Sequence, residues 1–163
     1  MVYPKCGLKK FPDVKPVTRP SVELRAIQDP NWLAGFIDGD GSFHIVSISK
    51  SSQIGYYCQL HFTVSQHSRD LPLLSSFITF LGCGRLCKSS TRTAAVEFVV
   101  TKLRDLEVKI IPFFKKYPLH GKKRLDFEDF CKIAALMKDK AHLTEIGLDQ
   151  IRKIKSRKSR DSG

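Results

Sequence analysis

Residues 33–41 read Leu-Ala-Gly-Phe-Ile-Asp-Gly-Asp-Gly, a stretch that the chain contains once. Residues four apart lie on one face of a helix, so Gly35 and Gly39 would form a face without side chains. A second helix can approach such a face backbone to backbone. Asp38 and Asp40 would then lie at the C-terminal end of the helix, beside the partner helix. One copy supplies half of such a junction, so the sequence predicts a partner.

Composition and charge bound the class of protein. The chain has 163 residues, 42% of them hydrophobic, which suits one folded domain with extensions. No apolar run is as long as a membrane span and no secretory signal is recognised, so we expect no membrane association. The formal net charge of +12 favours a polyanionic partner, usually a nucleic acid.

The cysteines number five and are scattered along the chain. Cys83 and Cys87 form the single close pair, and no second pair or histidine spacing completes a zinc site. Free thiols are typical of a reducing compartment. The sequence therefore predicts a location inside a cell or organelle.

Proline and hydrophobic spacing divide the chain into an arm and a domain. Residues 1–28 hold four prolines among lysines, which indicates an extended arm or linker, and residues 29–163 form the predicted domain. Asp29 would cap a helix that begins at Pro30. Further helices are predicted at 70–81, 103–114 and 122–140, with a last one capped by Thr144, and strands at 42–50, 56–65, 84–88 and 94–101.

This order predicts an α+β domain in which a four-stranded antiparallel sheet has helices on one face and a polar face left free. The strand at 56–65 alternates cleanly between apolar and polar residues. Which face of the first strand is buried is ambiguous. If Phe43 and Ile45 face the core, Val46 and Ile48 face away from it, and the reverse assignment is equally apolar. A bulge would reconcile both patterns. Trp32 is predicted to be a core residue.

Residues 33–41 resemble the defining motif of the LAGLIDADG homing endonucleases, and the predicted αββαββα order is similar to their core. Residues 66–70 and the Lys122–Lys123 pair occur in the same order as in that family. Residues 11–20 look like the linker of single-chain members from fungal organelle introns, and residues 29–36 like the start of their second half. The resemblance leaves three origins open: a natural homodimeric half, an engineered half, or one product of a split gene.

The resemblance implies roles for residues at the end of the motif helix. Asp40 would hold a divalent metal with the backbone carbonyl of Gly39, with Mg²⁺ expected and Mn²⁺ or Ca²⁺ as substitutes. The chemistry agrees, because phosphodiester hydrolysis needs charge neutralisation and an activated water. The alternative, an acid that merely ends a helix, places negative charge where the helix dipole disfavours it. Asp38 is expected to have a structural role more than a ligating one.

Three further residues are candidates for catalysis by resemblance. Gln66 would order water near the scissile phosphate, against the alternative of a glutamine in solvent. Lys123 would stabilise the charge that develops on the phosphate. The family usually has a Gln-Lys pair here, so Lys122 departs from the pattern, and a solvated lysine at a helix start is its alternative.

A two-stranded ribbon fits the DNA major groove, so polar residues of the free face are expected to contact bases. The predicted DNA-binding residues are Ser47, Ser49, Lys50, Tyr57, Gln59, His61, Thr63, Arg85, Lys88, Glu97 and Val99. The predicted helix junction with a second LAGLIDADG domain comprises Leu33, Gly35, Phe36 and Gly39.

The resemblance therefore implies a site-specific endonuclease that cuts both strands of a DNA duplex held in a saddle of two sheets. It would act as a homodimer or as a paired half, in a mitochondrion or another organelle. Two alternatives remain at this point: an RNA maturase that assists intron folding, and a DNA-binding half that is inactive without its partner.

Overall fold

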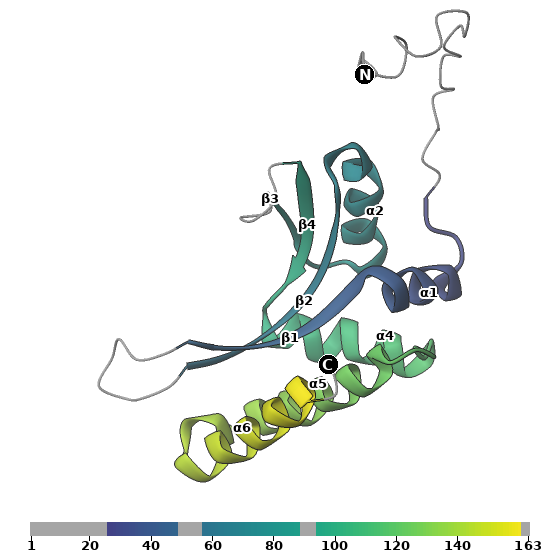
Figure 1. The fold of residues 1–163 in the computed structure, drawn as a ribbon. Coiled ribbons are helices and arrows are strands. Elements are labelled where there is room, and N and C mark those ends of the chain that lie inside the picture. The colour runs from purple at the N-terminus through teal and green to yellow at the C-terminus, as the bar shows by residue number, and fades with distance from the viewer. Residues whose placement is uncertain (1–25, 49–56, 89–93, 161–163) are drawn as a thin grey trace, which may run out of the picture.

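The computed structural model describes residues 26–48, 57–88 and 94–160 (Figure 1). Most of the predicted arm, and the predicted DNA contacts Ser49 and Lys50, lie outside these ranges. The elements are α1 (Pro30–Asp40), β1 (Gly41–Ile48), β2 (Tyr57–His67), η1 (Ser68–Asp70), α2 (Leu71–Leu81), β3 (Arg85–Lys88), β4 (Ala95–Val100), α3 (Leu103–Asp105), η2 (Leu106–Ile110), α4 (Ile111–Lys116), α5 (Lys123–Lys138), η3 (Ala141–Leu143) and α6 (Glu145–Arg160).

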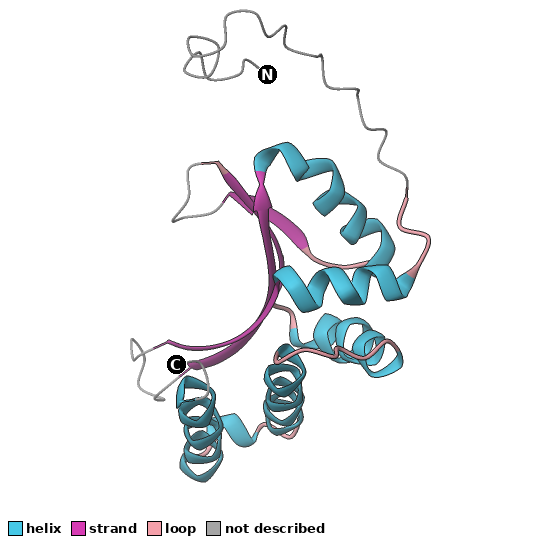
Figure 2. Ribbon diagram, turned by 45° about the vertical axis from the view of Figure 1, so that its right-hand side comes forward, coloured by secondary structure: helices cyan, strands magenta, loops and turns pink. Residues whose placement is uncertain are grey.

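The four strands form one antiparallel sheet in the order β1-β2-β4-β3. The sheet is strongly curved, and the helices lie on its convex side (Figure 2). The concave side carries no helix of the described chain (Figure 2). The predicted α+β class and the helix-hairpin-helix-hairpin order are confirmed.

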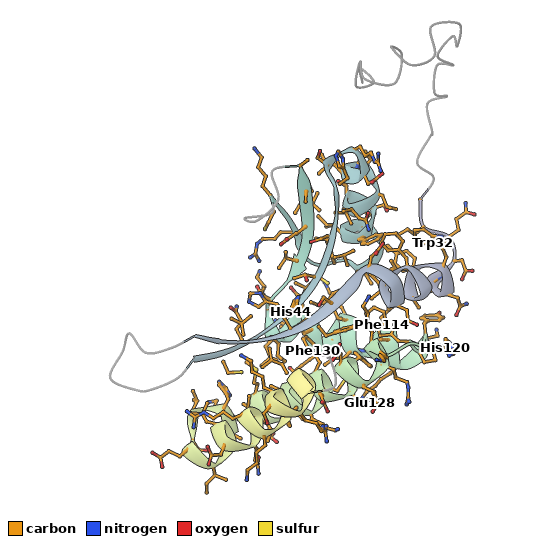
Figure 3. All side chains as sticks on the ribbon, viewed as in Figure 1. Trp32, His44, Phe114, His120, Glu128 and Phe130 are labelled. Atoms are coloured by element: carbon orange, nitrogen blue, oxygen red, sulfur yellow. The ribbon has the colours of Figure 1, made fainter. Side chains whose placement is uncertain are left out.

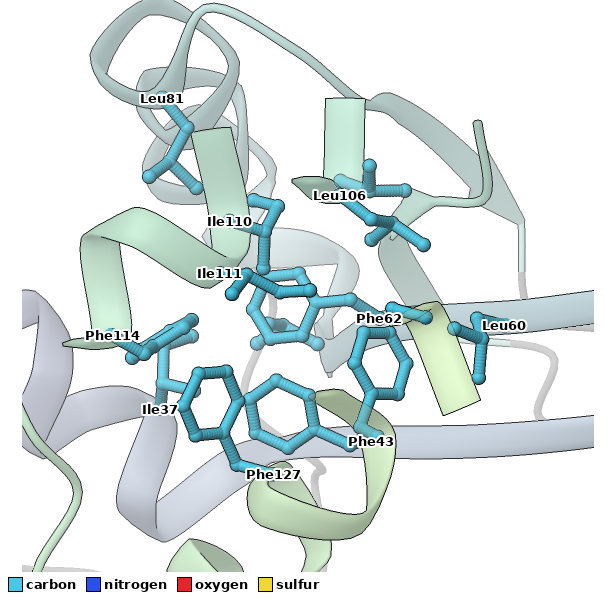
Figure 4. Packing of buried hydrophobic residues seen from close by; sticks show 14 of the residues in the cluster. Ile37, Phe43, Leu60, Phe62, Leu81, Leu106, Ile110, Ile111, Phe114 and Phe127 are labelled. Atoms are coloured by element: carbon cyan, nitrogen blue, oxygen red, sulfur yellow. The ribbon is translucent and has the colours of Figure 1, made fainter. Parts of the chain in front are cut away.

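Aromatic side chains fill the space between the sheet and the helices (Figure 4). Phe43 of β1 stacks on Phe62 of β2 at 5.1 Å between ring centroids, and Phe114 of α4 packs edge-on against both at 5.6 Å. All three are fully buried. Since truncating such a phenylalanine typically costs about 3–5 kcal/mol, this cluster holds the sheet rigidly against the helices.

Local signals set the ends of the helices as the sequence predicts. The carboxylate of Asp29 accepts the N–H of Asn31 at 2.8 Å, so it caps α1. Gly82 ends α2 in the left-handed conformation, with φ +67°. The hydroxyl of Thr144 accepts the N–H of Gly147 at 3.1 Å and caps α6.

The helix predicted at 103–114 is present, but its middle differs from an ordinary α-helix. Residues Leu106–Ile110 form a π-helical turn between α3 and α4. Pro112 follows one residue after this turn, and a proline has no N–H to donate and crowds the preceding turn. A wider turn accommodates both effects, as such turns often do inside helices.

The register of β1 settles the ambiguity of the first strand. Every residue from Gly41 to Ile48 pairs in sequence with β2, so the predicted bulge is absent. Phe43 and Ile45 are buried, and Ser47 has their parity. Strand residues two apart share a register row, and the predicted DNA contact of Ser47 stays a prediction.

Candidate active site

The C-terminal end of α1 brings two predicted catalytic residues together. Asp40 is the last residue of α1, and its Oδ2 accepts a hydrogen bond from Nε2 of Gln66 at 2.7 Å. Gln66 lies near the end of β2, 26 residues away along the chain. The glutamine therefore orients the carboxylate, and the alternative of a glutamine surrounded by solvent does not describe it.

Lys123, the first residue of α5, reaches the same helix end. Its ammonium donates to the carbonyl of Asp38 at 2.9 Å and also to the carbonyl of Gly39. These carbonyls belong to the last turn of α1 and have no partner within the helix. A cation at this place also complements the helix dipole. Lys122 precedes α5 and is exposed to solvent.

Asp38 has a structural partner in a distant loop. Its Oδ2 accepts the backbone N–H groups of His120 at 3.0 Å and Gly121 at 2.7 Å. Figure 3 shows His120 on the loop that runs below α1. The expectation that Asp38 has a structural role is in line with these contacts.

The donor set fits a hard divalent cation in part. The Asp40 carboxylate and the Gly39 carbonyl are the oxygen ligands that Mg²⁺ and Ca²⁺ prefer. The described residues contain no cluster of three or more His, Cys, Asp or Glu able to hold a metal. Within the described residues, Asp40 is therefore not joined by two further such side chains in one cluster.

The outward face of α1 is open, as its glycines predict. A Cβ atom placed on Gly35 or on Gly39 would meet nothing within 4 Å. Trp32 lies beside these glycines on the helix and is 47% exposed, so its predicted place in the core is wrong. Its ring stacks on Phe36 at 5.4 Å, and Phe36 in turn contacts Phe77 edge-on at 5.6 Å.

Leu33 does not lie on this open face. Its side chain is fully buried beside Ile37 in the core of its own domain. Residues two apart on a helix point about 200° apart, so Leu33 and Gly35 cannot share a face. The prediction that Leu33 contacts a second domain is therefore wrong.

The concave face of the sheet carries the predicted polar row of β2. Gln59, His61 and Thr63 are half-buried there and alternate with fully buried residues. Nε2 of His61 and Oε1 of Gln59 form a hydrogen bond of 2.9 Å. Burial, and secondarily the charge of Arg85, lowers the pKa of His61 below its usual value. Tyr57 has the parity of Gln59 in the register.

The register sorts the predicted contacts from β3 and β4. Arg85 and Glu97 have the parity of the concave face. Val99 shares that parity but is 6% exposed, so it offers no surface to a ligand. Lys88 pairs with buried Val96 and has the parity of the core side. The prediction for Val99 is therefore wrong. The side chain of Lys88 is exposed, and its DNA contact stays a prediction.

His44, on the concave face, is not among the predicted DNA-binding residues. His44 is exposed and pairs with His61 across β1 and β2 (Figure 3). The alternation of Phe43 and Ile45 indicates this position, but the bulge assumed for β1 obscured it.

Comparison with known proteins identifies the family. Residues 33–134, more than half of the chain, match the family model described as LAGLIDADG endonuclease. The chain belongs to this family. The predicted resemblance is thereby confirmed, and the glycine-faced helix α1 is the LAGLIDADG helix.

Individual relatives agree with the family model. Probable intron-encoded endonuclease 2 of Neurospora crassa is 35% identical over 158 residues, which cover 91% of this chain and 33% of that protein. The crystal structure of I-SmaMI bound to cleaved DNA matches with a TM-score of 0.87 and 42% identity over 94% of this chain and 51% of that chain. I-LtrWI bound to target DNA matches with a TM-score of 0.86, 39% identity and coverage of 95% and 52%.

The chain thus spans about a third of these curated relatives and about half of the solved chains. Another structure in this group is I-SmaMI bound to an uncleaved DNA target in the presence of calcium ions. Within the described residues, no helix is long and apolar enough to cross a membrane.

Proposed function

We propose that this chain is one half of a site-specific DNA endonuclease that requires a divalent metal and a second LAGLIDADG domain. The observation that carries the proposal is the end of α1. There an oriented carboxylate, Asp40, lies at the tip of a helix whose Gly35 and Gly39 face is open. Such a helix supports close pairing with a second copy, which would bring a second carboxylate to the first.

The second domain is either another copy of this chain or a complementary half. Both supply what the described part of one chain lacks, a further acidic ligand at the metal. The share of the solved chains that this chain covers, about half, supports the same arrangement. Trp32, Phe36 and the two glycines of α1 form the proposed contact surface.

Each residue at the junction has a distinct task in this proposal. Asp40 would hold Mg²⁺, together with the carbonyl of Gly39 once the ammonium of Lys123, which donates to that carbonyl in this structure, turns to the phosphate. The ion would neutralise phosphate charge and activate a water. Gln66 keeps the Asp40 carboxylate oriented and presents its amide oxygen to water. Lys123 places a positive charge near the phosphate, where charge develops during hydrolysis. Lys122 adds a second cation beside it.

DNA is proposed to lie along the concave face, as the paired saddle requires. Gln59, His61, Thr63, Arg85 and Glu97 face that side, and His44 joins them. A ribbon of this width suits the major groove, where glutamine, histidine and arginine side chains recognise base edges. Relatives whose structures contain DNA support this assignment.

An organelle such as the mitochondrion is the proposed location. The relatives include proteins named as intron-encoded endonucleases. The cysteines of the described residues are free thiols, as the sequence predicts, and suit a reducing compartment.

The test is cleavage of a library of duplexes with randomised target sequences by the full chain, alone and mixed with a complementary half, with Mg²⁺. We expect a single preferred site to be cut. Asp40→Asn should abolish cleavage and retain binding of the same site, because it removes a ligand charge without changing the concave face. Asp149→Asn, an exposed carboxylate on α6, is the matched control and should cut normally.

Three results would contradict the proposal, and each points elsewhere. Cleavage that persists in Asp40→Asn would remove this carboxylate from the chemistry. Tighter binding of structured intron RNA than of any duplex, without cleavage, would favour the maturase. A stable monomer that binds DNA but never cuts, with any partner half, would favour an inactive binding domain.

A further inference from the structure

A loop distant in sequence holds the last turn of α1 through a single residue. Oδ2 of Asp38 accepts the backbone N–H groups of His120 and Gly121 at 3.0 and 2.7 Å. The carbonyl of the same Asp38 accepts the ammonium of Lys123 at 2.9 Å. Asp38 thus contacts both the loop that leads into α5 and the first residue of α5, which lie 82 to 85 residues away.

The fit between the carboxylate and the loop leaves no spare room. A Cβ atom on Gly121 would lie 2.8 Å from Oδ1 of Asp38 and 3.2 Å from the carboxylate carbon. Oδ1 is buried and has no hydrogen-bond partner among the described residues. Because both N–H groups converge on the other oxygen, the carboxylate has one well-defined orientation, and a Cβ atom at residue 121 would force it to shift.

We infer that Asp38 is a positioning residue for Lys123. The inference rests on the proposed function, in which Lys123 acts on the phosphate. A carboxylate that accepts two N–H groups makes charge-assisted hydrogen bonds, which are stronger than neutral ones. These two hydrogen bonds hold the loop against α1. Because α5 begins directly after this loop, its first residue, Lys123, then lies within hydrogen-bond distance of the carbonyls of Asp38 and Gly39. Without the carboxylate, the two N–H groups turn to water and Lys123 loses its place beside Asp40.

Two substitutions disturb this contact from opposite sides. Asp38→Ala removes the acceptor, and Gly121→Ala pushes the acceptor away. Asp38→Asn keeps an oxygen that can accept both N–H groups and should restore most of the rate. Ile133→Val, in the core and away from α1, lowers stability without touching the contact and controls for a general loss of folded protein.

The readouts are single-turnover cleavage and DNA affinity of the paired full-length chain. Asp38→Ala and Gly121→Ala should lower the cleavage rate about 10²-fold, the loss typical of a misplaced catalytic group, while the Kd for DNA stays unchanged. Ile133→Val should cut at the wild-type rate per folded molecule. A cleavage rate within about twofold of wild type in Asp38→Ala or in Gly121→Ala would overturn the inference.

Nuclear magnetic resonance of the single chain gives a readout that does not depend on cleavage. The amide signals of His120 and Gly121 and the ammonium signal of Lys123 should all shift in Asp38→Ala, and Asp40→Asn should leave the two amide signals in place. If the Lys123 signal is unchanged in Asp38→Ala, the positioning role is wrong. If the wild-type chain never cuts DNA but the Lys123 signal moves as expected, the proposed function fails and the positioning role stands.

Discussion

At the scale of single residues, the two carboxylates of the motif have different partners although they are two positions apart. Oδ2 of Asp40 accepts a hydrogen bond from the side-chain amide of Gln66. The carboxylate of Asp38 accepts backbone N–H groups, and the residue is half-buried. These contacts support the proposal that Asp38 is the structural carboxylate and Asp40 the chemical one.

His61 gives a prediction at this scale. Burial first, and Arg85 second, lower its pKa, so its folded pKa lies below the value of 6.5 usual for the unfolded chain. The neutral form is therefore favoured in the fold, and His61 costs stability as the pH falls below 6.5 because the unfolded chain then binds the proton more readily. Titration by nuclear magnetic resonance should give a His61 pKa below 6.5.

Removing Arg85 separates the two causes. Arg85→Ala should raise the pKa of His61 part of the way, since burial is the larger cause and persists. Arg85 also donates to the hydroxyl of Thr101 at 3.3 Å. Thr101→Val removes this contact but not the charge, so it should leave the pKa of His61 unchanged. A His61 pKa at or above 6.5 in the wild type would contradict the prediction.

At the scale of elements, α1 has one face for its own core and one open face, which we propose pairs with a second domain. Leu33 and Ile37 are fully buried on the first face. Gly35 and Gly39 lie on the second, with open space around them. Because the two sets do not overlap, the fold of the domain and its pairing can be changed separately.

Two glycine substitutions should show this separation. Gly35→Leu meets open space at Cβ, so the isolated chain should keep its Tm within a few degrees, while the larger side chain prevents close pairing and abolishes cleavage. Gly41→Ala would place Cβ 2.4 Å from Cγ2 of Ile37 and 2.7 Å from its carbonyl oxygen, so it should destabilise the chain itself. Thermal unfolding and sedimentation velocity measure the two effects.

The prediction fails if Gly35→Leu still sediments as a pair with its partner domain and cuts DNA. It also fails if Gly41→Ala unfolds at the wild-type temperature. Either result would mean that the open face of α1 is not where the second domain docks, or that the turn from α1 into β1 is less tightly packed than its contacts indicate.

At the scale of the whole molecule, shape and charge together favour a duplex. The chain carries a formal net charge of +12, and its curved sheet leaves one face uncovered (Figure 2). The basic helix α6 packs beside α5 below the β1–β2 hairpin, and buried Asp129 pairs with its Arg157 (Figure 1). Part of the positive charge therefore stabilises the fold. We expect DNA binding by the concave face to depend on residues such as Arg85.

Salt dependence tests this view. The logarithm of the DNA association constant should fall linearly with the logarithm of salt concentration, with a slope of about −0.9 per phosphate neutralised. Arg85→Gln should weaken binding and make the slope shallower. Lys116→Gln, on α4 away from the concave face, is the matched control and should leave the slope as it is. Fluorescence anisotropy gives the association constant at each salt concentration, and the Asp40→Asn background avoids cleavage during the titration. A salt slope that Arg85→Gln leaves unchanged would contradict the prediction.

Much of this architecture could be predicted because its signals are local. Asp29, Pro30, Gly82 and Thr144 mark helix ends by the chemistry of their own neighbourhoods, and the alternation in β2 marks its two faces. The predictions for Trp32 and Leu33 failed for two different reasons. The exposure of Trp32 depends on long-range packing, which composition does not reveal. The error for Leu33 is local, because helix geometry alone separates it from Gly35 by about 200°.

The candidate site shows the same limit. Gln66 and Lys123 were predicted from family order, and the structure brings both to the end of α1. The contact of Asp38 with His120 and Gly121 joins residues more than 80 positions apart. No local pattern of the chain predicts such a contact, because it depends on where the fold places a loop.

The helix α1 passes into β1 without a connecting residue, since Asp40 ends one and Gly41 begins the other. The carboxylate proposed for catalysis and the strand proposed for base recognition therefore belong to one continuous segment of helix and strand. In this arrangement the distance between the recognised bases and the cleaved phosphodiester bond is fixed by the backbone. Engineers who retarget the protein by exchanging side chains on the sheet should find that the cut keeps its spacing from the new sequence.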